Sequence, residues 1–166
     1  MGMVGEYIRV DDKMLSKLKK GKKDIFELSE ELADSGAVTD LDKAWHIVHF
    51  VLSGKVWESG GEPLSRMVLG GAIVNEDSDG GYGPSTYLTV DEVREISAAA
   101  ESVSEEWFRE RYDKVKKNGK EVYILDSANE SEYDELFEYA WSYFLEAKEF
   151  FKQAAQEKQN IVFSVV

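Results

Sequence analysis

Residues 41–54 constrain the fold most, because their pattern predicts a short, mostly buried helix that carries both histidines of the chain. At 100° per residue, the large apolar side chains fall on one arc, which is typical of a helix packed on a core. That arc is formed by Leu41, Trp45, Val48 and Leu52. A narrow polar stripe beside it is formed by Asp42, His46, His49 and Ser53. We expect Asp40 to cap the start of this helix and Gly54 to end it.

The chain is strongly acidic, since its 166 residues include 33 acidic and 20 basic ones and its net charge is −13. A field of this sign repels the phosphates of nucleic acids and of anionic membranes. We therefore expect no nucleic acid and no membrane among its partners, but an unidentified protein partner that is basic. A well-solvated surface is the simpler explanation of the same charge. The length suits one domain, residues 1–166.

The sequence contains no cysteine, which excludes disulfides, thiol catalysis and cysteine-ligated zinc. No apolar run approaches the roughly 20 residues of a membrane-spanning helix, and the first residues lack the pattern of a signal peptide. We therefore expect a cytoplasmic protein, and no cofactor is predicted.

The order of predicted elements favours an α+β fold. Strands are expected at 5–10, 86–88, 121–125 and 161–166, and residues 72–74 form either a brief strand or a packed turn. Helices are expected at 63–69 and from 131 to about 157. Four more helices are expected to begin after capping residues, which are Asp11 or Asp12, Asp24, Thr89 and Ser104. The last strand is apolar throughout, so we expect it to be buried on both faces. The fold expected is a single domain with a small mixed sheet of about four short strands packed with five to seven helices.

The polar stripe contains the residue types of a hydrolase triad, but its spacing argues against one. Asp42 lies two helical turns, about 10 Å, from His49 and cannot orient its imidazole. A zinc site at His46 and His49 would need further ligands and lacks the usual spacing of a zinc-binding helix. The simpler interpretation is that His49 donates a hydrogen bond to a loop carbonyl.

Residues 75–84 form the longest irregular stretch, and such loops are often functional. Asn75, Asp77, Asp79 and Gly80 resemble the start of a calcium-binding loop, but its twelfth position is Thr86 where a bidentate glutamate is needed. The glycines that follow match no known phosphate-binding pattern. A solvated acidic loop is the better interpretation, and no metal site is predicted.

Two further features have structural explanations. Arg66 is the only cation between Lys55 and Arg94, and we expect it to pair with an internal carboxylate such as Asp42 or Glu62, with an anionic ligand as the alternative. The helix from residue 131 carries a wide aromatic stripe, of which one side is core and the other is a candidate dimer face. The chain is therefore expected to be a monomer or a homodimer.

Several motifs together resemble the YfbM-like family of bacterial proteins. They are Met1-Gly2-Met3 before a strand, Leu41-Asp42-Lys43-x-Trp45-x-x-x-His49-x-x-Leu52-x-Gly54, Pro63-Leu64-Ser65-Arg66-x-Val68-Leu69-Gly70, and Tyr82-Gly83-Pro84 leading to Tyr87-Leu88-Thr89. The resemblance covers the whole length and implies a single α+β domain of undefined activity. It carries over no catalytic residue, although His49 matches the histidine of the family pattern.

The family pattern places five residues on segments that can converge, and we expect them to line one shallow cleft. They are Asp42, Trp45, His49, Arg66 and Tyr82. Two classes of function follow. The first is an acidic binding module, such as an inhibitor or immunity-type protein that masks a basic partner. The second is a small enzyme, such as a hydrolase, that uses His49 as acid or base in a cleft with Asp42 and Arg66.

Overall fold

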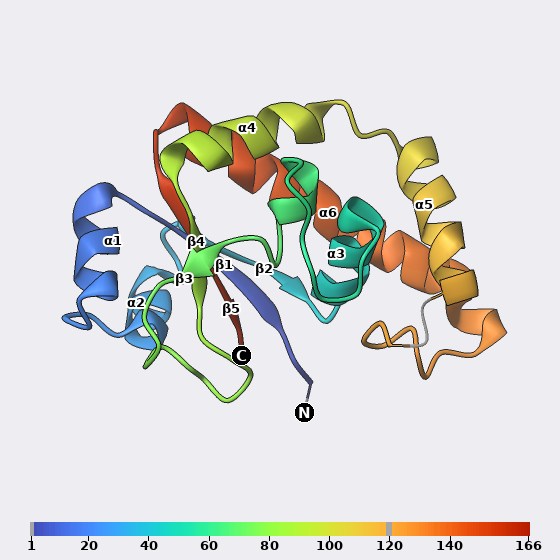
Figure 1. Ribbon diagram of the computed structural model, residues 1–166, viewed down its shortest axis with the longest axis horizontal. Helices are drawn as coiled ribbons and strands as arrows, with labels where there is room; N and C mark the ends of the chain where they lie inside the picture. Colours follow the sequence, from blue (N-terminus) through green and yellow to red (C-terminus); the bar gives the residue numbers. More distant parts are fainter. Residues whose placement is uncertain (1, 119–120) are drawn as a thin grey trace.

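The structure is a computed structural model that describes residues 2–118 and 121–166, with side chains described outside 115–118. Its strands are β1 (Gly5–Val10), β2 (Val38–Asp42), β3 (Ala72–Ile73), β4 (Thr86–Leu88) and β5 (Asn160–Val165). Its helices are α1 (Asp12–Lys19), α2 (Ile25–Leu32), α3 (Trp45–Ser53), α4 (Val90–Glu101), α5 (Glu105–Asn118) and α6 (Tyr133–Gln156), with short 3₁₀ turns η1 (Leu64–Arg66) and η2 (Glu130–Glu132). Figure 1 shows this arrangement, which confirms the expected α+β class.

The five described strands form one antiparallel sheet in the order β2-β1-β5-β4-β3. It therefore has one strand more than expected, and none of its pairings is parallel, so it is not the mixed sheet that the sequence suggested. The last strand, β5, lies at the centre between β1 and β4. The chain thus ends in the middle of its sheet, as its apolar sequence predicted.

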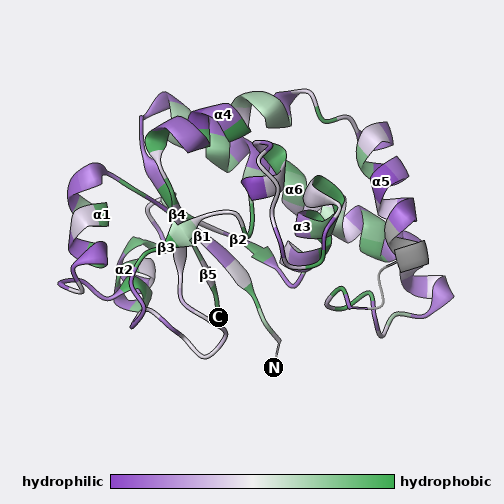
Figure 2. Ribbon diagram, viewed as in Figure 1, coloured by the Kyte–Doolittle hydropathy of each residue, from purple (hydrophilic) through white to green (hydrophobic). Residues whose placement is uncertain are grey.

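The two faces of the sheet are covered by different helices. On β5, Phe163 packs in the larger core with α3, α4 and α6, whereas its neighbour Val162 packs in a smaller core with α1 and α2. This alternation follows from the strand, whose successive side chains point to opposite faces. Figure 2 shows hydrophobic residues on α6 and β5 where they pack, while α5 is largely hydrophilic.

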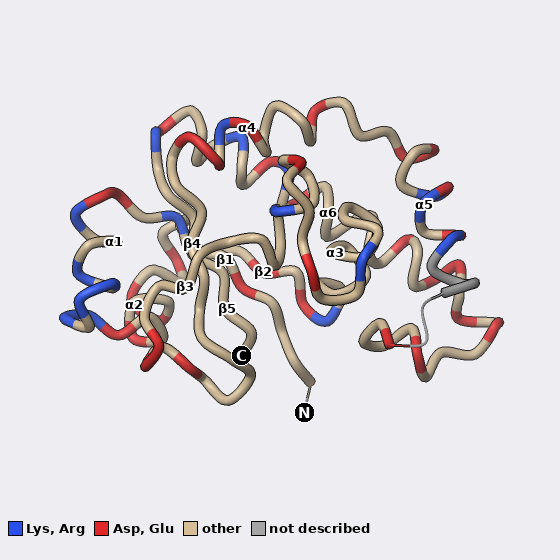
Figure 3. Tube along the Cα trace, in the orientation of Figure 1, with Lys and Arg blue, Asp and Glu red and all other residues tan. Residues whose placement is uncertain are grey.

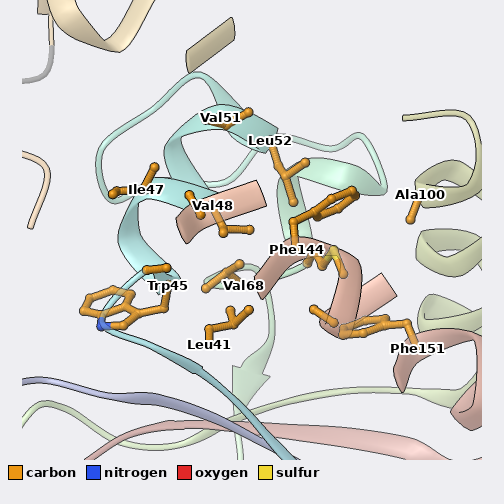
Figure 4. Packing of buried hydrophobic residues seen from close by; sticks show 14 of the residues in the cluster. Leu41, Trp45, Ile47, Val48, Val51, Leu52, Val68, Ala100, Phe144 and Phe151 are labelled. Carbon is orange, nitrogen blue, oxygen red and sulfur yellow. The ribbon is translucent and has the colours of Figure 1, made fainter. Parts of the chain in front are cut away.

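Helix α3 is enclosed on all sides, because every residue from Trp45 to Leu52 is buried. Figure 4 shows Leu52 of α3 pointing toward Phe144 of α6, with both in the larger core. The helix ends at Gly54, whose φ of 73° is the left-handed conformation that glycine adopts without steric cost. The helical part of residues 41–54, Trp45–Ser53, is therefore mostly buried in the core as expected.

Local capping chemistry sets the start of several helices. Asp11 accepts a hydrogen bond from Met14 N at the start of α1, and Asp24 accepts from Phe26 N at the start of α2. At α4, Thr89 and Glu92 form a reciprocal capping box. These three helix starts confirm the predictions from the sequence.

The predicted start of the helix in residues 41–54 is wrong, and so is one predicted strand. Residues 41 and 42 end strand β2 and do not open the helix, so α3 begins at Trp45 after Ala44, which makes no side-chain cap. Residues 121–125 form turns and not a strand. In that segment Ile124 has a φ of 64°, a left-handed conformation that no strand contains. Among the described residues, no helix is both long and apolar enough to cross a membrane.

Candidate functional site

Both nitrogens of His46 are used by the backbone of neighbouring segments. Its Nδ1 accepts a hydrogen bond from Tyr123 N at 2.9 Å, and its Nε2 lies 2.7 Å from Val56 O. Because Nδ1 accepts, Nε2 must carry the proton and donate it to the carbonyl. Burial lowers the pKa of His46, and the ring is fully buried. His46 is therefore a neutral side chain that joins two loops to α3.

His49 lies one turn further along the helix and is held through its Nε2. Its Nε2 lies 3.0 Å from Glu58 O, to which it donates, and 3.4 Å from Ser53 Oγ. The Ser53 hydroxyl itself donates to Lys55 O. Burial lowers the pKa of His49 to about 4, since only 1% of the residue is exposed. This is the bond to a loop carbonyl that the sequence analysis considered for His49.

Residues 54–62 are consequently tied to α3 by two imidazoles and by aromatic packing. The centroid of the His46 ring lies 5.0 Å from that of Trp45, on which it stacks, and 4.4 Å from that of Trp57, to which it is tilted by 33°. Trp45 is 2% exposed, and its Nε1 donates to Met3 O. A loop carbonyl was expected as the partner of His49, but the identity of the two carbonyls depends on how the loop returns over the helix.

Asp42 lies on β2 and faces α6 rather than the histidines. Its Oδ2 accepts a 2.5 Å hydrogen bond from the hydroxyl of Tyr139, which also accepts from Lys43 N. Asp42 has a φ of 44°, so the chain turns sharply where β2 ends. Tyr139 and Lys43 line a hollow of about 510 Å³ at the start of α6. Asp42 therefore fixes this turn. It is not part of the polar stripe on the helix, contrary to the prediction from the sequence.

Arg66 forms an internal ion pair, but with other partners than Asp42 or Glu62. Its guanidinium contacts Glu92 at 2.9 Å and Glu95 at 3.2 Å, both on α4. The expectation of an internal pair is therefore correct and the suggested partners are wrong. The observed partners, Glu92 and Glu95, follow from the packing of η1 against α4, which is a long-range contact that the sequence does not reveal.

Tyr82 lies in the 75–84 loop and is 51% exposed. In this loop Asp79 Oδ1 accepts from Gly81 N and Gly83 N, so its carboxylate is used within the turn itself. No three histidine, aspartate or glutamate side chains among the described residues are grouped so that they could hold a metal ion.

The five residues of the predicted cleft thus have separate environments. Within the described part of the chain, no hydrogen bond, ion pair or ring contact joins any two of them; they are Asp42, Trp45, His49, Arg66 and Tyr82. Each of the first four is used in an internal contact. The shared cleft remains a prediction.

A groove that the sequence did not predict lies between α5 and α6. It has a volume of about 620 Å³, its floor is Phe137, and its rim is formed by Glu105, Glu106, Arg109, Glu110, Asp113 and Glu138. Arg109 pairs with Asp113 at 3.1 Å and with Asp134 at 2.7 Å, and its guanidinium lies 4.8 Å from the Phe137 ring. Five carboxylates and one arginine, which is already paired, leave the lining of the groove negative. Figure 3 shows acidic and basic residues alternating along α5, so the negative charge is local to the groove. The acidic residues were visible in the sequence, but their convergence requires the packing of two helices.

Comparison with known proteins places the chain in a family. A family model described as a domain of unknown function, DUF1877, matches residues 1–164. The structure is similar to the crystal structure of YfbM from Escherichia coli, a protein of unknown function, with a TM-score of 0.74 and 21% sequence identity over 99% of this chain and 100% of that chain. No curated protein matches the chain. The YfbM-like resemblance is confirmed, and the chain belongs to the family described as the domain of unknown function DUF1877.

Proposed function

We propose that the protein is an acidic binding module whose α5–α6 groove takes up a basic segment of a partner protein, as an inhibitor or an immunity-type protein would do. The observation that carries this proposal is the composition of the groove. Four of its carboxylates, those of Glu105, Glu106, Glu110 and Glu138, have no ion pair with any described residue. Such a rim attracts lysine and arginine side chains.

Both the shape and the charge of the groove suit the binding of a basic segment. An apolar floor at Phe137 can receive the methylene stem of a lysine or arginine, whose charged head then reaches the carboxylates on the rim. Arg109 is held by Asp113 and Asp134, so it does not neutralise the free glutamates. The net charge of −13 adds long-range attraction for the same kind of partner.

The surroundings of the two histidines support binding rather than acid–base catalysis. A general acid or base must reach its substrate and titrate near the working pH. His49 is buried, donates to Glu58 O and has its pKa lowered to about 4. Arg66 is paired with two glutamates, and Asp42 is bonded to Tyr139. The contacts of these residues give the enzyme alternative no support.

The proposal is tested by affinity capture from a lysate of the organism that encodes the chain, with mass spectrometry of what is retained. The variant Glu110→Lys/Glu138→Lys reverses two exposed charges on the groove rim. The control Glu146→Lys/Glu149→Lys makes the same change in net charge at two exposed positions further along α6. Both variants are first checked for unchanged thermal unfolding.

We expect wild type and control to retain one basic protein, which the rim variant loses and which increasing salt releases. Because electrostatic steering depends on local charge, the association rate should fall at least about tenfold in the rim variant alone. Equal retention by all three proteins, or equal loss in both variants, would contradict a partner site in the groove.

A further inference from the structure

A second hollow, distant from the acidic groove in the sequence, is lined by basic residues. It has a volume of about 320 Å³ and lies where α1 and α2 meet the end of β1. Arg9, Lys13 and Lys17 line it together with the apolar side chains of Met14 and Leu28. Figure 3 shows basic residues gathering on α1 and the turn after it. On a chain of net charge −13, such a local excess of positive charge calls for an explanation.

The two lysines are free to bind a ligand. Lys13 and Lys17 are one helical turn apart and therefore project from the same side of α1. Neither forms an ion pair with a described residue. The one carboxylate that lines the hollow belongs to Asp11, and its Oδ1 accepts a hydrogen bond from Met14 N as the cap of α1. With this one carboxylate against two lysines without ion pairs, the local charge remains positive.

Two further residues that line this hollow have buried polar atoms without a hydrogen-bond partner. They are Arg9, at its Nε and Nη1, and Gln159, at its Oε1. The side chain of Arg9 is 12% exposed, and its ion pair with Glu157 is 3.5 Å long and mostly solvated on the glutamate side. The guanidinium of Arg9 also lies 5.9 Å from the Phe150 ring, so its charge is directed to the α6 side of the sheet and not to α1.

We propose that this hollow binds a small carboxylate with an apolar body, such as a medium-chain fatty acid. Lys13 and Lys17 supply charge-assisted hydrogen bonds for the carboxylate, and Met14 and Leu28 supply the apolar wall for its chain. The volume lies at the lower end of the range for small-molecule sites, which limits the ligand to a small one. This site is independent of the proposed protein-binding groove, since the two share no lining residue.

The probe for this site is octanoate, compared with octylammonium, which has the same chain and the opposite charge. Binding is measured by isothermal titration calorimetry, and its position by chemical-shift changes in two-dimensional NMR spectra. The variant Lys13→Gln/Lys17→Gln removes both free cations from the hollow. The control Lys20→Gln/Lys22→Gln removes two exposed lysines that do not line it, with the same change in net charge.

We expect octanoate to bind saturably and more tightly than octylammonium, with the largest shifts at α1 and the end of β1. Affinity should fall about tenfold or more in the Lys13→Gln/Lys17→Gln variant and stay within about twofold in the control. The proposal is overturned if octanoate does not bind better than octylammonium, if its shifts lie elsewhere, or if both variants bind it as wild type does.

Discussion

The buried histidines make a specific prediction about stability and pH. The pKa of His49 is lowered by burial to about 4 in the folded protein, against about 6.5 for the exposed side chain. As pH falls below 6.5, the unfolded chain binds a proton that the folded protein does not bind until about pH 4. The contribution of His49 to the free energy of unfolding is therefore fully present above pH 7 and is lost as the pH falls from 6.5 to 4. Below pH 4 the protonation of His49 causes no further loss.

The size of the effect follows from the two pKa values. Over the whole window the loss is about 3 kcal/mol, and between pH 7 and pH 5 it is about 2 kcal/mol. The lowered pKa of His46 contributes in the same direction. The measurement is the free energy of unfolding from urea titrations at pH 7 and pH 5 for wild type and His49→Gln. The difference between the two pH values should be about 2 kcal/mol smaller in the variant.

The control for this prediction is Ser53→Ala, which leaves both imidazoles in place and removes only the hydroxyl 3.4 Å from His49 Nε2. It should keep the full dependence on pH. If wild type is equally stable at pH 7 and pH 5, or if His49→Gln loses as much stability as wild type on acidification, then His49 is not held neutral by burial and the reasoning fails.

Three other substitutions test the packing and the ends of the helices by chemical denaturation. Phe144→Ala should cost about 3–5 kcal/mol, because the ring is fully buried between α3 and α6, and a loss under 1 kcal/mol would show that the core is packed differently. Thr89→Ala should cost about 1 kcal/mol by removing the capping box of α4, with a shift in the urea midpoint as readout. Lys158→Gly should stabilise the protein by up to about 1 kcal/mol, since Lys158 is exposed with a φ of 54° after α6; a lower melting temperature would refute this.

The sequence predicted those parts of the fold that depend on local patterns. Strand β1 occupies the expected residues 5–10, and the capping pair Thr89 and Glu92 opens α4. Strand β2 was missed because Asp40 and Asp42, which are unfavourable in strands, interrupt its short sequence, and because its last two residues were assigned to the following helix. It exists because β1 offers it an edge to pair with, which is a contact between distant parts of the chain.

The candidate site was less predictable for the same reason. The spacing of His46 and His49 indicated a polar stripe, but their partners Val56 O and Glu58 O are backbone atoms that no side-chain pattern reveals. The groove between α5 and α6 likewise depends on how two helices pack. Residues 121–125 look like a strand by composition, yet Ile124 adopts a left-handed turn. Turn geometry of this kind overrides the preference of β-branched residues for strands.

The most direct test of the account is an NMR titration of the two histidine rings, with long-range proton–nitrogen correlation spectra from pH 8 to pH 4. In the structure both rings are neutral side chains that carry their proton on Nε2 and hold loops in place. We therefore expect nitrogen shifts of that single tautomer for both rings down to about pH 5, with His49 taking up its proton only near pH 4. A midpoint of 6.5 or higher for His49, or a proton on its Nδ1, would contradict the claim and restore His49 as a candidate acid or base.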